Sequence, residues 1–185
     1  MSRENHFMSS DDEWWDVVDA EGAPTGDTFR RGTACWPSGR FHLIVAVCVQ
    51  NADGAVLLTQ RSAGKEFPFG WEFPGGSALA GESSRNAASR ELREETGLGV
   101  PPSALTLVDR FVEASALLDF YIASEPVGAD VRLQQSEVLA AEWVTPEEVV
   151  RRLRAGVMAD PWVARLDSLW LPTTRALSIA RRAIR

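Results

Sequence analysis

A nearly continuous apolar run at residues 41–50 (FHLIVAVCVQ) restricts the fold of this chain more than any other segment. The run is rich in β-branched residues and lacks the alternation of a strand with one face in water, so it predicts a strand buried on both faces. A turn signal follows at residues 51–54 (NADG), and a second apolar stretch at residues 55–60 predicts that the two strands form a hairpin. The first strand therefore belongs inside a sheet that is covered on both sides.

Strand and helix patterns are interspersed along the rest of the chain. Strands are predicted at residues 14–18, 71–73, 105–112, 116–124 and 143–144, and helices at residues 82–96 and 146–154. Residues 22–40 are rich in glycine and proline and are expected to be a loop-rich connection. One or two further helices, broken at Pro172, are expected between residues 162 and 185. Because strict strand–helix–strand alternation is missing, the pattern predicts an α/β fold with a mixed sheet and helices packed on it.

The net charge of −7 is concentrated at one end of the chain. Residues 1–27 contain eight acidic residues and one basic residue, whereas the remaining 158 residues contain 18 of each sign. From residue 149 to the end, eight arginines stand against two aspartates. This division argues against a nucleic-acid binder, which needs a basic field over its working surface. The acidic and basic ends could instead pair within one protomer or across a homodimer.

The length of 185 residues predicts one domain. Residues 1–13 are expected to be a disordered acidic N-terminus, and residues 14–185 to form a single domain with an extra helical segment at its C-terminus. No apolar stretch has the length of a signal peptide core or a membrane span, which predicts a cytoplasmic protein without a membrane partner. Cys35 and Cys48 are too few for a disulfide framework and are expected to be small buried hydrophobes.

Three glutamates, Glu91, Glu94 and Glu95, share one arc of the first predicted helix because they are spaced i, i+3 and i+4. Like charges this close repel each other, so something must offset the repulsion. One explanation is a solvated face on which Arg90 and Arg93 pair with the glutamates. The other is a divalent cation, since Mg²⁺ prefers hard oxygen ligands and bridges carboxylates to substrate phosphates.

The spacing of residues around this helix resembles a known motif. Residues 76–98 read glycine, five residues, glutamate, seven residues, Arg-Glu-aliphatic-any-Glu-Glu-any-Gly-aliphatic, which is the pattern of the Nudix box at all nine specified positions. By this resemblance the chain is identified as a member of the Nudix hydrolase superfamily. The resemblance implies an α/β/α sandwich with a mixed β-sheet. It also implies cleavage of a diphosphate linkage in a nucleoside di- or triphosphate derivative by water attack on phosphorus, with Mg²⁺ or Mn²⁺ as cofactor.

The family pattern implies roles for individual residues. The expected metal ligands are the main-chain carbonyl of Gly75 and the side chains of Glu91, Glu94 and Glu95. Arg90 matches the arginine that orients the glutamates by ion pairing. Glu82 matches the first glutamate of the box, whose role varies in the family between metal ligand and structural support.

A general base is expected in the loop before a tryptophan-containing strand, where several Nudix enzymes carry a further glutamate. Glu137, six residues ahead of Trp143, is the best match, either as base or as an extra metal ligand. Glu142 and Glu113 are weaker candidates, and a solvated loop acid is the alternative interpretation of Glu137.

Motifs outside the box resemble the isopentenyl-diphosphate isomerase-like branch of the superfamily. They include residues 15–22, Arg61, Lys65 and residues 160–162, and the branch implies that Arg61 and Lys65 bind the substrate's diphosphate. A solvated surface lysine is the alternative interpretation of Lys65. Isomerisation itself is not implied, because the isomerases use a cysteine just upstream of the box and an adjacent metal-binding histidine. Residues 71–76 (WEFPGG) contain neither.

Three functions follow from these patterns, each with a small-molecule diphosphate as partner. The first is a Mg²⁺-dependent pyrophosphohydrolase acting on a nucleoside di- or triphosphate derivative. The second is a hydrolase of an isoprenoid or other non-nucleotide diphosphate, for which four tryptophans could line an apolar pocket: Trp14, Trp15, Trp36 and Trp71. The third is a non-catalytic binding module of the same fold, which the intact set of glutamates argues against.

Overall fold

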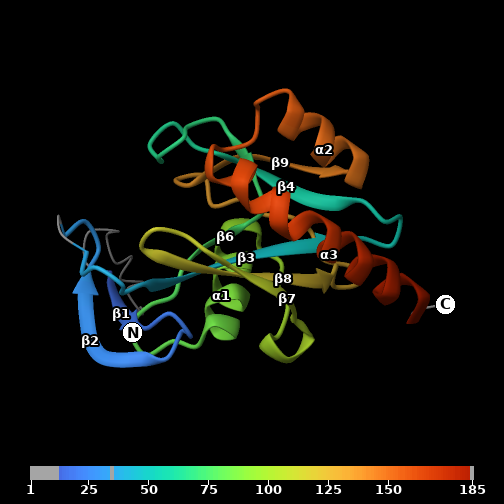
Figure 1. Cartoon of the computed structure of the whole chain (residues 1–185). Helices are drawn as coiled ribbons and strands as arrows, with labels where there is room; N and C mark the ends of the chain where they lie inside the picture. Colours follow the sequence, from blue (N-terminus) through green and yellow to red (C-terminus); the bar gives the residue numbers. More distant parts are fainter. Residues whose placement is uncertain (1–12, 34–35, 184–185) are drawn as a thin grey trace, which may run out of the picture.

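The computed structural model of the protein describes residues 13–33 and 36–183. The strands are β1 (Trp14–Val18), β2 (Pro24–Arg30), β3 (His42–Gln50), β4 (Val56–Arg61), β5 (Trp71–Glu72), β6 (Gly75–Ser77), β7 (Thr106–Val112), β8 (Ala116–Ser124) and β9 (Val138–Val144). The helices are α1 (Ser84–Thr96), the short 3₁₀ helix η2 (Pro102–Ala104), α2 (Pro146–Arg154) and α3 (Pro161–Ala183) (Figure 1). The predictions of disorder at residues 1–12 and of burial at Cys35 lie outside the described residues.

Strand β3 is the centre of a mixed sheet. It pairs in parallel with β8 along its whole length, from His42 opposite Ala116 to Gln50 opposite Ser124. Strand β7 continues the sheet antiparallel to β8, and β6 pairs antiparallel with the other edge of β3. Strand β4 meets β3 only where the hairpin begins and then diverges to pair with β9 and β5. The predicted mixed sheet and the hairpin are both confirmed.

Helices cover both faces of this sheet, as the apolar run in β3 predicts (Figure 1). Val47 belongs to the apolar cluster beneath α1, where it lies with Leu92. Cys48, the next residue, points to the opposite cluster, which contains Trp162 of α3. Alternate residues of one strand therefore pack against different helices, which gives the α/β/α arrangement and confirms the predicted fold class and the burial of Cys48.

Helix α1 is bounded by the sequence signals that predict it. The Ser83 side chain accepts a hydrogen bond from the Asn86 N–H and forms the N-cap. Gly97 adopts φ 76° and its N–H donates to the Arg93 carbonyl, so the helix ends there. These caps set which residues are helical, so Glu91, Glu94 and Glu95 all lie within the same helix.

Two predictions about strands are wrong in detail. Residues 24–30 form strand β2 and not a loop, because they pair with β1 in a separate two-stranded sheet in which Phe29 lies opposite Trp15. Their glycine and proline content is tolerated because Pro24 is the first residue of its strand. Strand β9 begins at Val138, five residues before the predicted start at Trp143, and gains this length by pairing with β4.

The C-terminal segment is one helix and not two, because α3 continues through Pro172. The Thr173 hydroxyl donates to the Leu169 carbonyl at 2.6 Å, a side-chain contact one turn back along the same helix. Burial of Trp162, Leu169 and other residues against the sheet offsets the cost of about 3 kcal/mol of an interior proline. Although α3 is 23 residues long, none of the described helices is long and apolar enough to cross a membrane.

Arginines at the basic end of the chain form ion pairs with carboxylates outside residues 1–27. Arg151 and Arg152 both pair with Glu148, Arg152 also pairs with Glu142, and Arg165 pairs with Glu113. These three arginines therefore have partners within the folded domain. Pairing between the two oppositely charged ends of the chain stays a prediction.

Candidate functional site

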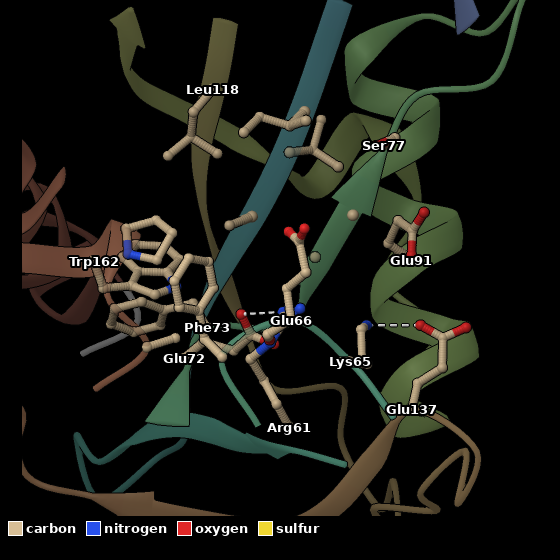
Figure 2. Close-up of a pocket in the computed structure, with 18 of the residues that line it drawn as sticks. Arg61, Lys65, Glu66, Glu72, Phe73, Ser77, Glu91, Leu118, Glu137 and Trp162 are labelled. Carbon is tan, nitrogen blue, oxygen red and sulfur yellow. Dashed lines mark hydrogen bonds and ion pairs between the residues drawn. The ribbon is translucent and has the colours of Figure 1, made fainter. Parts of the chain in front are cut away.

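An open cavity of about 250 Å³ lies where α1, β6, the loop after β4 and the start of α3 meet (Figure 2). Its lining includes seven of the residues predicted from the sequence, namely Arg61, Lys65, Gly75, Arg90, Glu91, Glu94 and Glu137. Glu82 and Glu95 lie outside this lining but contact residues within it. The fold thus brings together side chains that lie as far apart in sequence as Arg61 and Glu137.

Arg90 holds three of the four glutamates of the box in place. Its guanidinium donates to both oxygens of Glu82, with the shortest contact at 2.8 Å, and to Glu91 at 2.8 Å and Glu94 at 3.0 Å. It also donates to the Ser77 carbonyl at 3.0 Å, which ties the helix to β6. A planar guanidinium has five N–H donors in a fixed arrangement, so Arg90 alone can orient three carboxylates.

Glu95 is buried to 1% exposure on the side of α1 that faces the sheet. Its carboxylate accepts from the Gly75 N–H at 3.0 Å and from the Lys65 ammonium at 3.3 Å. Burial raises the pKa of Glu95 to about 8, and the nearby carboxylates of Glu72 and Glu91 add to the rise, while Lys65 and the Gly75 N–H oppose it. The interpretation of the glutamates as a solvated face with salt bridges is therefore wrong for Glu95. This carboxylate is buried, and a buried carboxylate needs a compensating charge.

Glu91 lines the cavity from α1, and Ser77 lies above it in the view (Figure 2). Burial raises its pKa to about 7, partly opposed by Arg90 and reinforced by Glu94 and Glu137. The room for its carboxylate depends on Gly76, because a Cβ at that position would lie 2.6 Å from the Glu91 carboxylate atoms. The first glycine of the box therefore has a steric role in the site.

Lys65 and Glu137 lie on two different loops at the cavity, and their side chains contact each other. The Lys65 ammonium donates to Glu137 at 2.7 Å (Figure 2). It also donates to the buried Glu95 at 3.3 Å. Burial acts to lower the pKa of Lys65, but Glu95 and Glu137 outweigh it, so the pKa lies above its ordinary value. Lys65 thus carries a charged ammonium that lies between two carboxylates of the candidate site. Glu137 contacts this ammonium, so the interpretation of Glu137 as a solvated loop acid without contacts is wrong.

Glu72, at the end of β5, is a functional candidate that the sequence reasoning missed. It is buried, and both of its oxygens accept from one terminal nitrogen of Arg61, at 2.7 and 2.8 Å (Figure 2). Burial raises its pKa, against the effect of Arg61 and Lys65. Its signal in the sequence is one acidic residue in the otherwise apolar stretch 71–74 (WEFP). The contact fixes Arg61 at the cavity wall.

The donor chemistry of the site fits a hard divalent cation. Glu91, Glu94 and Glu95 supply carboxylate oxygens, which Mg²⁺ prefers over nitrogen and sulfur. Within residues 13–33 and 36–183, no three acidic, histidine or cysteine side chains converge closely enough to hold one ion. Instead, Arg90 and Lys65 contact these carboxylates. The Lys65 ammonium, 3.3 Å from a Glu95 oxygen, would compete with a metal ion for that carboxylate.

The four tryptophans suggested as an apolar pocket do not line the cavity, so that prediction is wrong. Trp15 stacks on His42 with ring centroids 4.4 Å apart, and Trp36 packs against both rings. Trp71 lies under the Arg152 guanidinium, 4.2 Å from ring centroid to guanidinium carbon. Trp14 is exposed at the start of β1. These rings support the N-terminal hairpin and the β5 region.

The weaker candidates for a base are engaged elsewhere. Glu142 pairs with Arg152, and Glu113 accepts from Arg165 at 2.6 Å. Neither glutamate lines the cavity, whereas Glu137 does.

The raised pKa values of Glu91 and Glu95 predict a pH dependence of metal binding. In the metal-free protein, the folded state holds protons that the unfolded state has released. These two groups therefore contribute stability below about pH 4.5 that is lost as the pH rises through 7 to 8. A divalent cation needs both carboxylates ionised, so we expect Mg²⁺ to raise the melting temperature more at about pH 9 than at about pH 6. Thermal denaturation with and without Mg²⁺ at the two pH values measures this, and equal stabilisation at both would contradict it.

Comparisons with known proteins agree on one family. Residues 40–166 match the family model described as the NUDIX domain. A Nudix hydrolase of Listeria monocytogenes is 35% identical over 140 residues, which cover 74% of this chain and 82% of the relative. The isopentenyl-diphosphate Delta-isomerase of Leifsonia xyli is 32% identical over 153 residues, 77% of this chain and 80% of that enzyme. The crystal structure of DR0079 from Deinococcus radiodurans superposes with a TM-score of 0.68 at 26% identity, over 83% of this chain and 96% of that one.

Proposed function

Because this chain belongs to the Nudix hydrolase family, we propose that it is a Mg²⁺-dependent pyrophosphohydrolase that cleaves the diphosphate linkage of a nucleoside di- or triphosphate derivative. The observation that carries the proposal is the set of glutamates on α1, oriented by Arg90 at the wall of a cavity. The buried Glu95 beside them supports it, since a buried carboxylate with a raised pKa is a marker of functional sites.

Hydrolysis is favoured over isomerisation by what lines the cavity. Its described lining contains no cysteine and no histidine, the two residue types that the isomerases are expected to need. Cys48 lies in the apolar core, where burial raises the pKa of its thiol and keeps it protonated. His42 is stacked on Trp15, and its Nδ1 lies 2.9 Å from the Ser115 carbonyl oxygen. The contacts of Cys48 and His42 therefore indicate structural roles for both residues.

In the proposed reaction, water attacks one phosphorus atom, and the bond from that phosphorus to the bridging oxygen breaks. Glu91, Glu94, Glu95 and the Gly75 carbonyl would hold Mg²⁺, which neutralises charge on the phosphoryl oxygens and lowers the pKa of bound water. Arg61 and Lys65 would bind the diphosphate, and Arg90 keeps the carboxylates oriented. Glu137 would accept the proton that the attacking water loses. Glu82 would support Arg90 as its ion-pair partner.

A substrate panel tests this proposal. Purified protein would be assayed with Mg²⁺ for release of phosphate products from nucleotide sugars, ADP-ribose, dinucleoside polyphosphates and nucleoside triphosphates. Isopentenyl and dimethylallyl diphosphate would form a separate arm, because the isomerase relative favours a non-nucleotide diphosphate as the second candidate substrate. We expect higher kcat/KM for a nucleotide, and no turnover when EDTA replaces Mg²⁺. Tight diphosphate binding without any product would instead indicate the non-catalytic binding module.

Lys65→Met should affect metal and substrate binding in opposite directions. Without the ammonium, Glu95 has no competing cation in contact with it, so we expect Mn²⁺ to bind the substrate-free protein more tightly. Loss of a charge-assisted contact to the diphosphate should raise KM about ten-fold. Electron paramagnetic resonance of Mn²⁺ and steady-state kinetics measure the two effects, with Lys65→Arg as the charge-preserving control. Metal affinity that stays the same or falls in Lys65→Met would rule out the competition.

A further inference from the structure

The loop between β4 and β5, residues 62–70, carries two phenylalanines in a backbone conformation that bulky residues rarely adopt. Phe67 has φ 51° and Phe69 has φ 65°. The left-handed region is unfavourable for a residue with a Cβ, so such positions persist only where the surroundings impose them. Both rings are exposed, Phe67 to 43% and Phe69 to 55%. The fold therefore places two large apolar side chains at the surface in strained conformations.

Hydrogen bonds at both ends hold the loop in this shape. The Arg61 N–H donates to the Gly70 carbonyl and the Phe69 N–H donates to the Arg61 carbonyl, each at 3.0 Å. The Arg61 side chain donates to the Glu66 carbonyl at 2.5 Å, and Gln60 donates to the Phe69 carbonyl at 2.9 Å. Arg61 thus fixes the loop through its backbone and its side chain. The backbone that carries Phe67 is therefore held by contacts within the protein.

Phe67 is the exposed aromatic residue in the described lining of the candidate site cavity, and it also lines a second cavity beside Phe69. The described lining contains three aromatic side chains, Phe67, Phe73 and Trp162. Phe73 and Trp162 are each exposed to only 1% and pack on each other with ring centroids 5.0 Å apart. Their faces are covered by protein, so they cannot offer a stacking surface to a ligand. Of these three aromatic side chains, Phe67 is the one on which a flat group bound at this cavity could stack.

The size of the cavity places part of the substrate beside this ring. A volume of about 250 Å³ is below the range of about 300 to 1,000 Å³ that encloses most of a small organic ligand. A diphosphate bound by Arg61 and Lys65 would therefore leave one attached group at the rim. Phe67 lies two residues after Lys65, and both residues line the cavity.

We propose that Phe67 is a specificity-determining residue whose exposed ring stacks on the nucleobase of the substrate while Arg61 and Lys65 bind its diphosphate. The inference rests on the proposed function and specifies which part of the substrate is recognised. A nucleobase offers a flat π-face to the ring, which an aliphatic prenyl chain does not. Phe67 would therefore favour nucleotide over prenyl diphosphates.

Binding measurements on the full chain separate this stacking from the binding of the diphosphate. The two probes are α,β-methylene-ADP and methylenediphosphonate, which share a hydrolysis-resistant diphosphonate and differ in the nucleoside. With Mg²⁺ present, we expect Phe67→Ala to weaken calorimetric binding of the nucleotide analogue about ten-fold and to leave methylenediphosphonate unchanged. Phe67→Tyr should bind like the wild type. Phe69→Ala is the matched control, since Phe69 is exposed on the same loop at a similar φ but does not line the catalytic cavity.

The outcomes distinguish this inference from the proposed function. If Phe67→Ala weakens the binding of both probes equally, Phe67 acts by holding the loop that carries Lys65, and the proposed stacking is refuted. If neither probe is affected, or if the wild type does not bind the nucleotide analogue, the inference is also overturned. Nucleotide-specific loss of binding in a protein that hydrolyses none of the panel substrates would support Phe67 and refute the hydrolase.

Discussion

Glu95→Gln should lower turnover by about 10³-fold or more while the protein stays folded. The amide is isosteric and can still accept from the Gly75 N–H, but it cannot supply the negative charge that a divalent cation needs. Loss of one such electrostatic group in an active site costs about 10² to 10³-fold, and loss of a metal ligand costs at least as much. Measurement of kcat at saturating Mg²⁺, with Mn²⁺ binding by electron paramagnetic resonance, checks the result.

Stability separates this effect from unfolding. Because burial disfavours the ionised form of Glu95, we expect the metal-free Glu95→Gln protein to melt at the same temperature as the wild type or higher. Glu94→Gln should cause a similar loss of turnover from a more exposed position. Glu147→Gln, in the first turn of α2, is an exposed glutamate away from the cavity and serves as the control. A Glu95→Gln enzyme that keeps more than about a tenth of wild-type turnover is incompatible with a catalytic metal ligand.

Arg90→Met should reduce kcat by about 10²-fold or more and destabilise the fold by about 2 to 4 kcal/mol. Removing the guanidinium leaves Glu82 and Glu91, both largely buried, without their main ion-pair partner. Glu94 also loses its contact, so the repulsion among the glutamates is no longer offset. Because Arg61 and Lys65 would bind the diphosphate, KM should change less than kcat. Steady-state kinetics and urea denaturation measure the two parts.

Arg90→Lys tests whether orientation or charge is the important property. Lysine restores one positive charge but cannot donate to three carboxylates and to the Ser77 carbonyl at once. We expect it to recover part of the stability and little of the turnover. Arg93→Met, an exposed arginine on the same helix, should change neither. Full recovery of kcat in Arg90→Lys would show that net charge, and not orientation, is what the site requires.

The elements with strong local signals are the ones that the sequence predicts well. The apolar run of β3, the capping residue Ser83 and the stop at Gly97 depend on patterns within a few residues. The strand β2 was missed because its glycine and proline content indicates a loop, whereas its structure comes from pairing with β1. The predicted helix break at Pro172 is wrong for the same reason, since burial of α3 overrides the low helix preference of proline.

The candidate site shows the same division. Glu91, Glu94 and Glu95 could be predicted because they share one helix and one spacing motif. The contact of Lys65 with Glu95, 30 residues away, depends on how the β4–β5 loop folds over α1 and has no local signal. Glu72 and Phe67 were missed because burial in one case and exposure in the other are tertiary properties. These residues can be identified only from the structure.

Hydrolysis in ¹⁸O-labelled water, followed by ³¹P NMR, tests the proposed reaction most directly. The reaction would use the best nucleotide substrate of the panel, with Mg²⁺, and Glu95→Gln as the inactive control. Attack of water on phosphorus predicts one ¹⁸O atom in one of the two phosphorus-containing products, and neither label nor product when EDTA replaces Mg²⁺. Unlabelled phosphate products would show cleavage of a carbon–oxygen bond and would contradict the proposed reaction, as would turnover that does not depend on the metal.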